Sequence, residues 1–198
     1  MVTVNGHKAV NSVDTMTNAG MILAGGQSLR MGQDKALLNY QGLTLLDYMQ
    51  QLLKPVTLSH VYISRSDYIA DCIADKGPLG GIYSVVQQLP ASVLSLLILP
   101  IDMPLLKPQL LQNLVDKAQD DPSRAYYYQS TVLPLCLPIN EAVKAHLKQA
   151  VSSQKTYSIR WLLETTQLEA LPLKPEDMPY FANMNTPEQW HDVVKESR

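Results

Sequence analysis

Residues 23–35 read LAGGQSLRMGQDK and begin at the last residue of a short apolar run over residues 19–23. The run is typical of a buried strand, and the Gly-Gly pair after it lets the backbone turn sharply and bring its amides close to a ligand. Backbone amides in such turns bind anions, and the Arg and Lys of the same stretch add two cations. The spacing fits neither the GxGxxG dinucleotide-binding pattern nor the Walker A motif, which needs Ser or Thr where Ala36 stands. The stretch therefore predicts a strand followed by a phosphate-binding loop of another kind.

Strand-like and helix-like segments alternate along the rest of the chain. Apolar runs predict strands at residues 19–23, 61–64, 93–99, 125–128, 132–137 and 168–173. Apolar residues at helical spacing, with caps such as Thr44 and Thr186, predict helices at 45–53, 82–89, 141–150 and 160–164, and helices that begin at 108 and 187. This alternation predicts an α/β fold, a Rossmann-like three-layer sandwich with a mostly parallel central sheet. We expect residues 1–18 to be a flexible extension and residues 19–198 to form one domain.

Composition restricts the classes of function. The 198 residues are 46% apolar and 17% charged with a net charge of −2, so we expect no binding to nucleic acid. Two cysteines without zinc-site or disulfide spacing indicate a reducing compartment, and we expect a cytoplasmic protein. Residues 77–101 carry no charge but divide at Leu89-Pro90 into unlike halves. They predict a helix followed by a strand rather than a segment that crosses a membrane.

Asp102 follows the nearly continuous apolar run at residues 93–99, which is expected at the centre of the sheet. Ligands of open α/β sheets bind outside the carboxyl ends of the strands. A carboxylate at this place could hold Mg²⁺ that bridges the oxygens of a triphosphate. A single Asp in a turn is usually only a turn residue, so the position alone does not assign a metal site.

Four motifs of this sequence resemble those of the molybdenum-cofactor guanylyltransferases, a family of the NTP-transferase fold. The first reads Leu-Ala-Gly-Gly, Arg-Met-Gly, Asp-Lys and Leu-Leu, and residues 23–38 contain these groups in order. Residues 100–104 match Pro-x-Asp-x-Pro, residues 77–81 resemble a Gly-Pro-Leu-Ala-Gly loop before a helix, and residues 183–187 resemble Asn-x-Asn-Thr-Pro. The resemblance covers residues 19 to about 190 and implies a fold like that of the nucleotide-diphospho-sugar transferases.

The resemblance also implies a set of site residues. Arg30, Lys35 and Asp102 are implied to be catalytic, with Asp102 as the metal ligand. The implied nucleotide-binding residues are Leu23, Ala24, Gly25, Gly26, Lys35, Ser64, Asp71 and Asp102; Ser64 or a neighbour stands where the family has Asn, and Asp75 is the alternative to Asp71. The implied acceptor-binding residues are Gly77, Pro78, Leu79, Gly80, Asn183 and Asn185. Residues 125–137 lack the His-Pro of the family in the region expected to help hold the pterin.

The activity that the resemblance implies is transfer of GMP from GTP to the molybdopterin cofactor, which gives molybdopterin guanine dinucleotide and pyrophosphate. Mg²⁺ is the implied cofactor, and transient contacts with proteins that supply the cofactor or mature molybdoenzymes are implied partners. The attacking phosphate is already mostly dianionic at pH 7, because its second pKa is about 6, so no general base is needed. The alternatives are a cytidylyl or sugar-phosphate nucleotidylyltransferase, and a non-catalytic nucleotide-binding module that delivers the cofactor.

Overall fold

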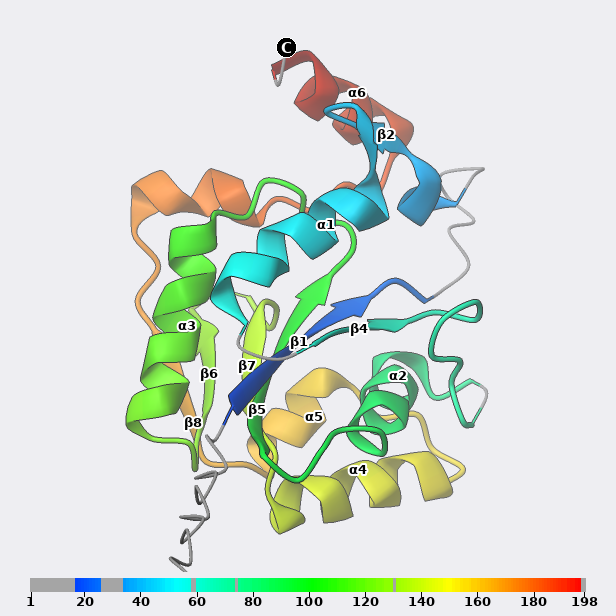
Figure 1. Ribbon diagram of the computed structural model, residues 1–198, viewed down its shortest axis with the longest axis vertical. Coiled ribbons are helices and arrows are strands. Elements are labelled where there is room, and N and C mark those ends of the chain that lie inside the picture. The colour runs from blue at the N-terminus through cyan, green and yellow to red at the C-terminus, as the bar shows by residue number, and fades with distance from the viewer. Residues whose placement is uncertain (1–16, 26–33, 58–59, 74, 130, 197–198) are drawn as a thin grey trace, which may run out of the picture.

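A six-stranded sheet forms the centre of the protein in the computed structural model, which describes residues 17–25, 34–57, 60–73, 75–129 and 131–196 (Figure 1). Its strands are β1 (Thr17–Leu23), β4 (Val61–Ser64), β5 (Val93–Pro100), β6 (Ala125–Tyr128), β7 (Leu135–Pro138) and β8 (Leu168–Leu171). They lie in the order β4-β1-β5-β7-β6-β8. Only β7 runs against its neighbours β5 and β6, and the other pairs are parallel. The predicted α/β fold with a mostly parallel sheet is therefore confirmed.

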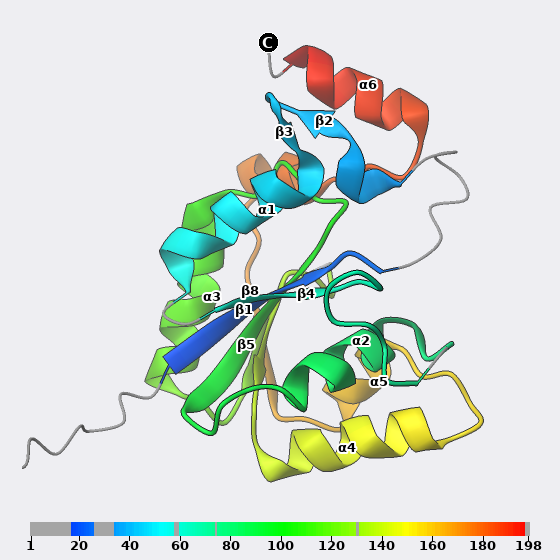
Figure 2. The ribbon, with the colours of Figure 1, turned by 45° about the vertical axis from the view of Figure 1, so that its right-hand side comes forward.

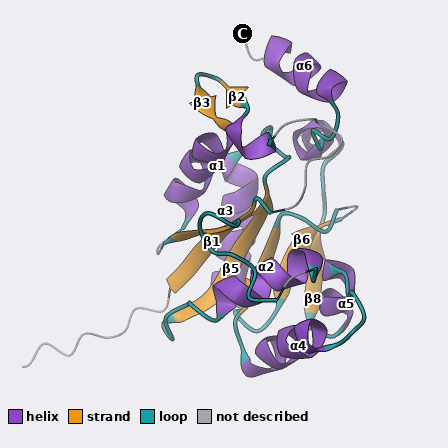
Figure 3. Ribbon diagram, turned by 90° about the vertical axis from the view of Figure 1, so that its right-hand side faces the viewer, coloured by secondary structure: helices purple, strands orange, loops and turns teal. Residues whose placement is uncertain are grey.

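Helices cover both faces of the sheet, as two views of the ribbon show (Figures 2 and 3). The helices are α1 (Leu45–Leu53), α2 (Gly77–Val86), α3 (Pro108–Asp120), α4 (Glu141–Ser152), α5 (Ile159–Glu164) and α6 (Pro187–Glu196), with 3-10 turns at Lys35–Leu37, Lys54–Val56 and Pro175–Phe181. One buried cluster joins α1 and α3 to the sheet, and a second joins α2, α4 and α5 to its other face. The molecule thus has the three predicted layers.

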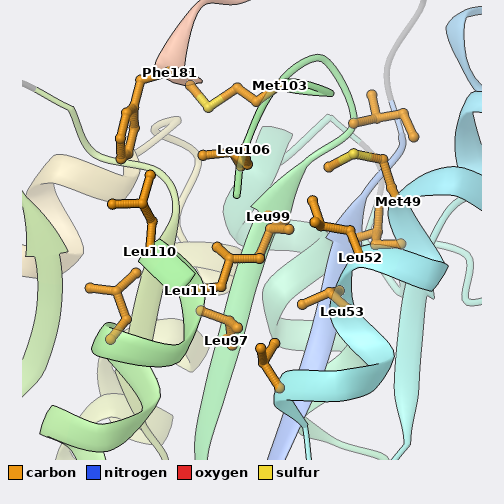
Figure 4. Packing of buried hydrophobic residues seen from close by; sticks show 14 of the residues in the cluster. Met49, Leu52, Leu53, Leu97, Leu99, Met103, Leu106, Leu110, Leu111 and Phe181 are labelled. Atoms are coloured by element: carbon orange, nitrogen blue, oxygen red, sulfur yellow. The ribbon is translucent and has the colours of Figure 1, made fainter. Parts of the chain in front are cut away.

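The central strand β5 supplies side chains to both of these clusters. Leu97 and Leu99 point toward α1 and α3, where they meet Leu53 and Leu111 (Figure 4). The alternate residues Leu96 and Ile98 belong to the cluster on the other face. Because successive side chains of a strand point to opposite faces, a strand covered on both sides must be apolar throughout. Burial on both faces explains the apolar run that precedes Asp102. Because the run ends at Pro100, Asp102 lies just beyond the end of the central strand.

Several predicted boundaries were wrong. Helix α2 begins at Gly77, so residues 77–81 are its first turns and not a loop before it. Strand β7 spans residues 135–138 instead of 132–137, and β8 ends at Leu171 instead of 173. Strand β1 begins at Thr17, two residues earlier than predicted, because the side chain of Asn18 donates a hydrogen bond to the Val56 carbonyl and so satisfies its buried amide. The expected flexible segment up to residue 16 lies outside the described residues.

A small hairpin, which the sequence patterns did not predict, stands at one end of the molecule beside α6 (Figure 2). Its strands are β2 (Asn39–Tyr40) and β3 (Leu43–Thr44). Gln41 and Gly42 both have positive φ, at 51° and 83°, as a two-residue hairpin turn requires. The ring of Tyr40 lies 5.8 Å from that of Trp190, centroid to centroid, so the hairpin and α6 pack together.

Residues 77–101 contain a helix followed by a strand, α2 and β5, as predicted. Among the described residues, no helix is both long enough and apolar enough to cross a membrane.

Candidate active site

The carboxyl ends of β4, β1 and β5 lie side by side at one edge of the sheet. Leu23 at the end of β1 is paired with Ser64 of β4 on one side and with Pro100 of β5 on the other. Two backbone hydrogen bonds continue this pairing beyond the strands: Ala24 N–H donates to the Ser64 carbonyl at 3.1 Å, and Ile101 N–H donates to the Leu23 carbonyl at 3.1 Å. The first loops after three strands therefore start from one fixed place, where open α/β sheets bind their ligands.

Three of the predicted site residues, which are far apart in the sequence, come together at this edge. The Nζ atom of Lys35 donates a hydrogen bond to Asn185 Oδ1 at 2.7 Å. The same Nζ atom lies 3.6 Å from Asp102 Oδ2, and the two side chains are 14% and 20% exposed. The backbone adds a further link, because Met184 N–H donates to the Asp102 carbonyl at 2.8 Å. The segments that carry the Asp-Lys, Pro-x-Asp-x-Pro and Asn-x-Asn-Thr-Pro motifs thus meet around one ammonium group.

Local structure fixes the position of each partner of this cluster. Lys35 is the first residue of a 3-10 turn that Asp34 caps, since Asp34 Oδ1 accepts a hydrogen bond from Ala36 N–H at 3.0 Å. Asn185 is held from the other side by Gln189, whose Oε1 accepts from Asn185 N–H at 2.8 Å and from Thr186 N–H at 3.1 Å. The predicted capping box at the start of α6 is therefore present, and it also holds the residue that binds Lys35.

Ser64 and Asp71 form a second part of the site, against the first turns of α2. Ser64 is buried, and its Oγ atom donates to Asp71 Oδ1 at 3.5 Å. Gly80 and Gly81 permit this approach, because a Cβ atom on Gly81 would lie 2.2 Å from Ser64 Oγ and one on Gly80 would lie 3.3 Å from Asp71 Oδ2. Partial burial raises the pKa of the Asp71 carboxyl, and the hydrogen bond from Ser64 offsets part of that rise. Of the two aspartates considered for nucleotide binding, Asp71 is the one that lies beside Ser64.

The predicted acceptor-binding residues lie on the first turn of α2 and before α6. Leu79 is 1% exposed and its side chain packs in the core, so only its backbone could contact a ligand. Within the described part of the chain, no side chain caps the start of α2 at Gly77. Its first backbone amides are therefore available to an anion. Asn183 is exposed, whereas the Asn185 side chain is engaged by Lys35.

Some predicted residues of the first loop cannot be placed. Leu23 and Ala24 are half-buried and Gly25 is exposed at the end of β1. Gly26 and Arg30 lie outside the described residues. Their assignment to the phosphates stays a prediction.

The donor set at Asp102 fits Mg²⁺. Among the residues that the structure describes, no three His, Cys, Asp or Glu side chains form a cluster able to hold a metal by themselves. Mg²⁺ is commonly bound by one or two carboxylates together with substrate phosphates and water, rather than by an all-protein cage. Asp102 offers a single partly exposed carboxylate of the kind that this mode of binding uses.

A cavity of about 410 Å³ lies farther along the sheet, between the strands β6 and β8 and helix α5. Polar and apolar side chains line it together, among them Tyr127, Gln129, Arg160, Leu163 and Glu164. Since β6 runs in the direction of β5, Gln129 lies at the same edge of the sheet as Pro100, two strand spacings or about 10 Å away. No motif marked these residues, because the cavity joins side chains of separate elements that share no spacing.

The chain matches the family model for the MobA-like NTP transferase domain over residues 20–170. A curated relative, the molybdenum cofactor guanylyltransferase of Xanthomonas euvesicatoria pv. vesicatoria, is 38% identical over 183 residues, which cover 90% of this chain and 95% of the relative.

Two solved structures show how widely the fold is shared. Molybdopterin-guanine dinucleotide biosynthesis protein A from Archaeoglobus fulgidus matches with a TM-score of 0.71 at 19% identity, over 90% of this chain and 97% of that one. The 4-diphosphocytidyl-2C-methyl-D-erythritol synthase from Anaerococcus prevotii matches with a TM-score of 0.70 at 12% identity, over 93% and 97% of the two chains. Both similarities concern the fold alone.

Proposed function

Because the chain belongs to the family of MobA-like NTP transferase domains, we propose that it transfers GMP from GTP to the molybdopterin cofactor. The products are molybdopterin guanine dinucleotide and pyrophosphate. The observation that carries the proposal is the meeting of Lys35 and Asp102 at the carboxyl edge of the sheet, 3.6 Å apart, in a protein whose net charge is −2. The choice of substrates is supported by the name of the 38% identical relative.

The proposed reaction is an attack by a phosphate oxygen of molybdopterin on the α-phosphorus of GTP. A bond forms between that oxygen and the α-phosphorus, the bond to the bridging oxygen of the β-phosphate breaks, and pyrophosphate carries away the electron pair. The nucleophile is already mostly deprotonated near neutral pH, because the second pKa of a phosphate monoester is about 6. The work left to the protein is positioning and the neutralisation of charge.

Lys35 is suited to the α-phosphoryl region, because Asn185 holds its ammonium group in one place and leaves other N–H donors of that group for a phosphate. Asp102 would hold Mg²⁺, which when bound neutralises charge on the triphosphate. The backbone amides around Gly25 and Gly26, together with Arg30, are assigned to the phosphates. Asp71 and Ser64 are assigned to the nucleoside.

Guanine is proposed over cytosine on a local argument, since the fold is shared with an enzyme whose name refers to a cytidylyl product. Gly25 carries no Cβ, so a base edge can approach the backbone closely, donate to the Ala24 carbonyl and share the Leu23 carbonyl with Ile101 N–H. Guanine has N1–H and N2–H₂ donors for such acceptors. An acceptor left buried and unpaired by the wrong base costs about 1–3 kcal/mol.

The cavity beside α5 is our proposed place for the pterin end of the acceptor. Its lining reaches Gln129, which lies at the edge of the sheet that carries Asp102, and a volume of about 410 Å³ is sufficient for a fused heterocycle. Arg160 and Glu164 form no ion pair with another described residue and can therefore bind polar edges of a ligand. Arg160→Ala should raise the KM for molybdopterin and leave the KM for GTP unchanged. A raised KM for GTP with an unchanged KM for molybdopterin would show that the acceptor does not bind in this cavity.

The test is a competition between nucleotides. The purified protein is incubated with Mg²⁺, molybdopterin and equal concentrations of GTP, CTP and ATP, with the label on the α-phosphate of one nucleotide at a time. We expect label from GTP in a dinucleotide product and one pyrophosphate released for each label transferred. Label from CTP would make the protein a cytidylyltransferase, and transfer only to a sugar phosphate would identify the other enzyme class. Binding of GTP without transfer would indicate a non-catalytic nucleotide-binding module.

The expected cytoplasmic location, and transient contacts with proteins that supply the cofactor or mature molybdoenzymes, belong to the same proposal.

A further inference from the structure

Arg65, the first residue after β4, uses all three nitrogens of its guanidinium group. Nη2 lies 2.7 Å from Asp34 Oδ2, and Nη1 donates to Asp34 Oδ1 at 3.0 Å. The Nε atom donates to Asp67 Oδ1. The Arg65 side chain is only 14% exposed. A planar, two-point contact of this kind fixes both the distance and the orientation of the carboxylate, which a single-point contact does not do.

The carboxylate that Arg65 holds is the cap of the turn that carries Lys35. Asp34 Oδ1 accepts from Arg65 and also from Ala36 N–H, at 3.0 Å in each case. Lys35 lies between Asp34 and Ala36 in the chain, and its ammonium group contacts Asn185 and Asp102. A chain of direct contacts therefore runs from Arg65 through one carboxylate to the backbone of the turn whose lysine we assign to the α-phosphoryl region.

Arg65 also binds the first described residue after the segment 26–33. At the near end, Ala24 N–H donates to the carbonyl of Ser64. At the far end, Asp34 is bound by the next residue along, Arg65. Ala24 and Asp34, which lie on either side of residues 26–33, are thus both attached to consecutive residues at the end of β4.

Two other roles for Arg65 fit the geometry less well. A phosphate-binding arginine needs free donors, but this guanidinium faces two carboxylates, and the three charges sum to −1, which does not attract a triphosphate. The second role is that of an ion pair that only stabilises the fold. Exposed ion pairs contribute about 0–1 kcal/mol to stability, and weakening a pair of this kind would leave catalysis unchanged. Asp34 is 43% exposed, so the contribution of the pair to stability is expected to be small.

We propose that Arg65 is a positioning residue for nucleotidyl transfer: by holding Asp34 at two points it keeps the Lys35 turn, and with it the Lys35 ammonium group, in the place that the α-phosphoryl group requires. The inference rests on the proposed function for its kinetic consequence. The placement of Lys35 itself can be measured without any reaction.

The test compares Arg65→Lys, which keeps the charge and loses the two-point contact, with Asp34→Asn, which keeps the size and weakens the same contact. Arg124→Lys is the matched control, because Arg124 also pairs with a carboxylate, that of Asp121 at 3.0 Å, but on an element away from the site. We expect each of the first two variants to lower kcat by about 10–100-fold, the loss typical of a misplaced catalytic group. The KM for GTP should change less than threefold, and Tm should stay within about 2 °C of the wild type.

The double variant separates positioning from two independent losses. Because both changes break one contact, the double variant should have nearly the same kcat as either single variant. Multiplied losses in kcat, a kcat equal to that of the wild type, or a loss of Tm with kcat retained would each overturn the proposal. The control Arg124→Lys should keep the kcat and KM of the wild type.

A chemical measurement keeps the inference separate from the proposed function. Each protein is treated briefly with acetic anhydride, and the acetylation rate of Lys35 is followed by mass spectrometry, with the exposed Lys148 as internal reference. Lys35 is 14% exposed and hydrogen-bonded, so it should react slowly in the wild type and at least severalfold faster in Arg65→Lys and Asp34→Asn. Faster labelling in a protein that turns out to transfer no nucleotide would support the positioning role and refute the proposed function. Unchanged labelling would overturn the positioning role whatever the protein catalyses.

Discussion

Gly81→Ala tests how closely helix α2 packs on the end of β4. The added Cβ atom would lie 2.2 Å from Ser64 Oγ and 3.1 Å from Ser64 Cβ. Ordinary van der Waals contact begins at 3.4 Å, so the first of these is too short by 3.4 − 2.2 Å, or 1.2 Å. Ser64 is 2% exposed, so either its Oγ atom rotates to another position or α2 moves outward.

The magnitude follows from two opposing effects. Overpacking of a buried contact costs about 1–3 kcal/mol, and an overlap this large belongs at the upper end. Replacing Gly by Ala inside a helix returns roughly 1 kcal/mol of helix propensity. We therefore expect the free energy of unfolding to fall by about 2 kcal/mol, which is roughly 4–8 °C in Tm for a domain of this length. The KM for the nucleotide should rise as well, because the same movement displaces Asp71.

The assay is urea unfolding of the wild type and three variants, followed by circular dichroism. Gly25→Ala is the matched control, since its Cβ would lie at ordinary contact distances from Ser64, 3.4 Å from the carbonyl oxygen and 4.0 Å from Oγ. Ser64→Ala combined with Gly81→Ala removes the atom at 2.2 Å and should recover part of the loss. A Gly81→Ala protein that is as stable as the wild type would refute the packing argument, and so would a double variant less stable than Gly81→Ala alone.

Three further substitutions test the proposed roles of the site residues. Asp102→Asn keeps the size of the side chain but removes the charge assigned to Mg²⁺, and turnover at saturating Mg²⁺ should fall by at least about 10²-fold; near-normal turnover would exclude the ligand role. Lys35→Ala should weaken GTP binding measured by calorimetry and change Tm little, whereas lost Tm with unchanged affinity would make Lys35 structural. Gly25→Ala should reduce the preference for GTP over CTP in direct competition more than it reduces stability, and an unchanged preference would separate Gly25 from base selection.

The parts of the fold that could be predicted were those in which the local pattern and the final packing agree. Residues 45–53 show a helical apolar stripe between a Thr cap and a proline, and α1 spans those residues. Helix α2 differs, because its first turns contain three glycines and read as a loop. Positions 80 and 81 of this helix are occupied by glycine because a side chain at either position would collide with Lys76, Asp71 or Ser64. The glycines are thus explained by tertiary contacts, which helix propensity cannot predict from the local sequence.

The site divides in a similar way. Lys35 and Asp102 could be predicted as neighbours, since each follows a strand whose carboxyl end lies at the same edge of a parallel sheet. The contact between Lys35 and Asn185 joins residues 150 positions apart, and the one between Arg65 and Asp34 joins residues 31 positions apart. Neither pair has a fixed spacing to detect, so only the folded chain identifies these contacts.

The hydrogen bond between Lys35 and Asn185 has a consequence for how the protein is made. A ribosome that adds about 5–20 residues per second needs roughly 8–30 s to travel the 150 residues that separate the two partners. From the moment Asp102 is added until Asn185 follows 83 residues later, the nascent chain contains Lys35 and Asp102, while the amide that fixes the lysine has not been synthesised. Under the proposed function, the site for GTP is therefore completed only when residue 185 of 198 has been added, close to the end of translation.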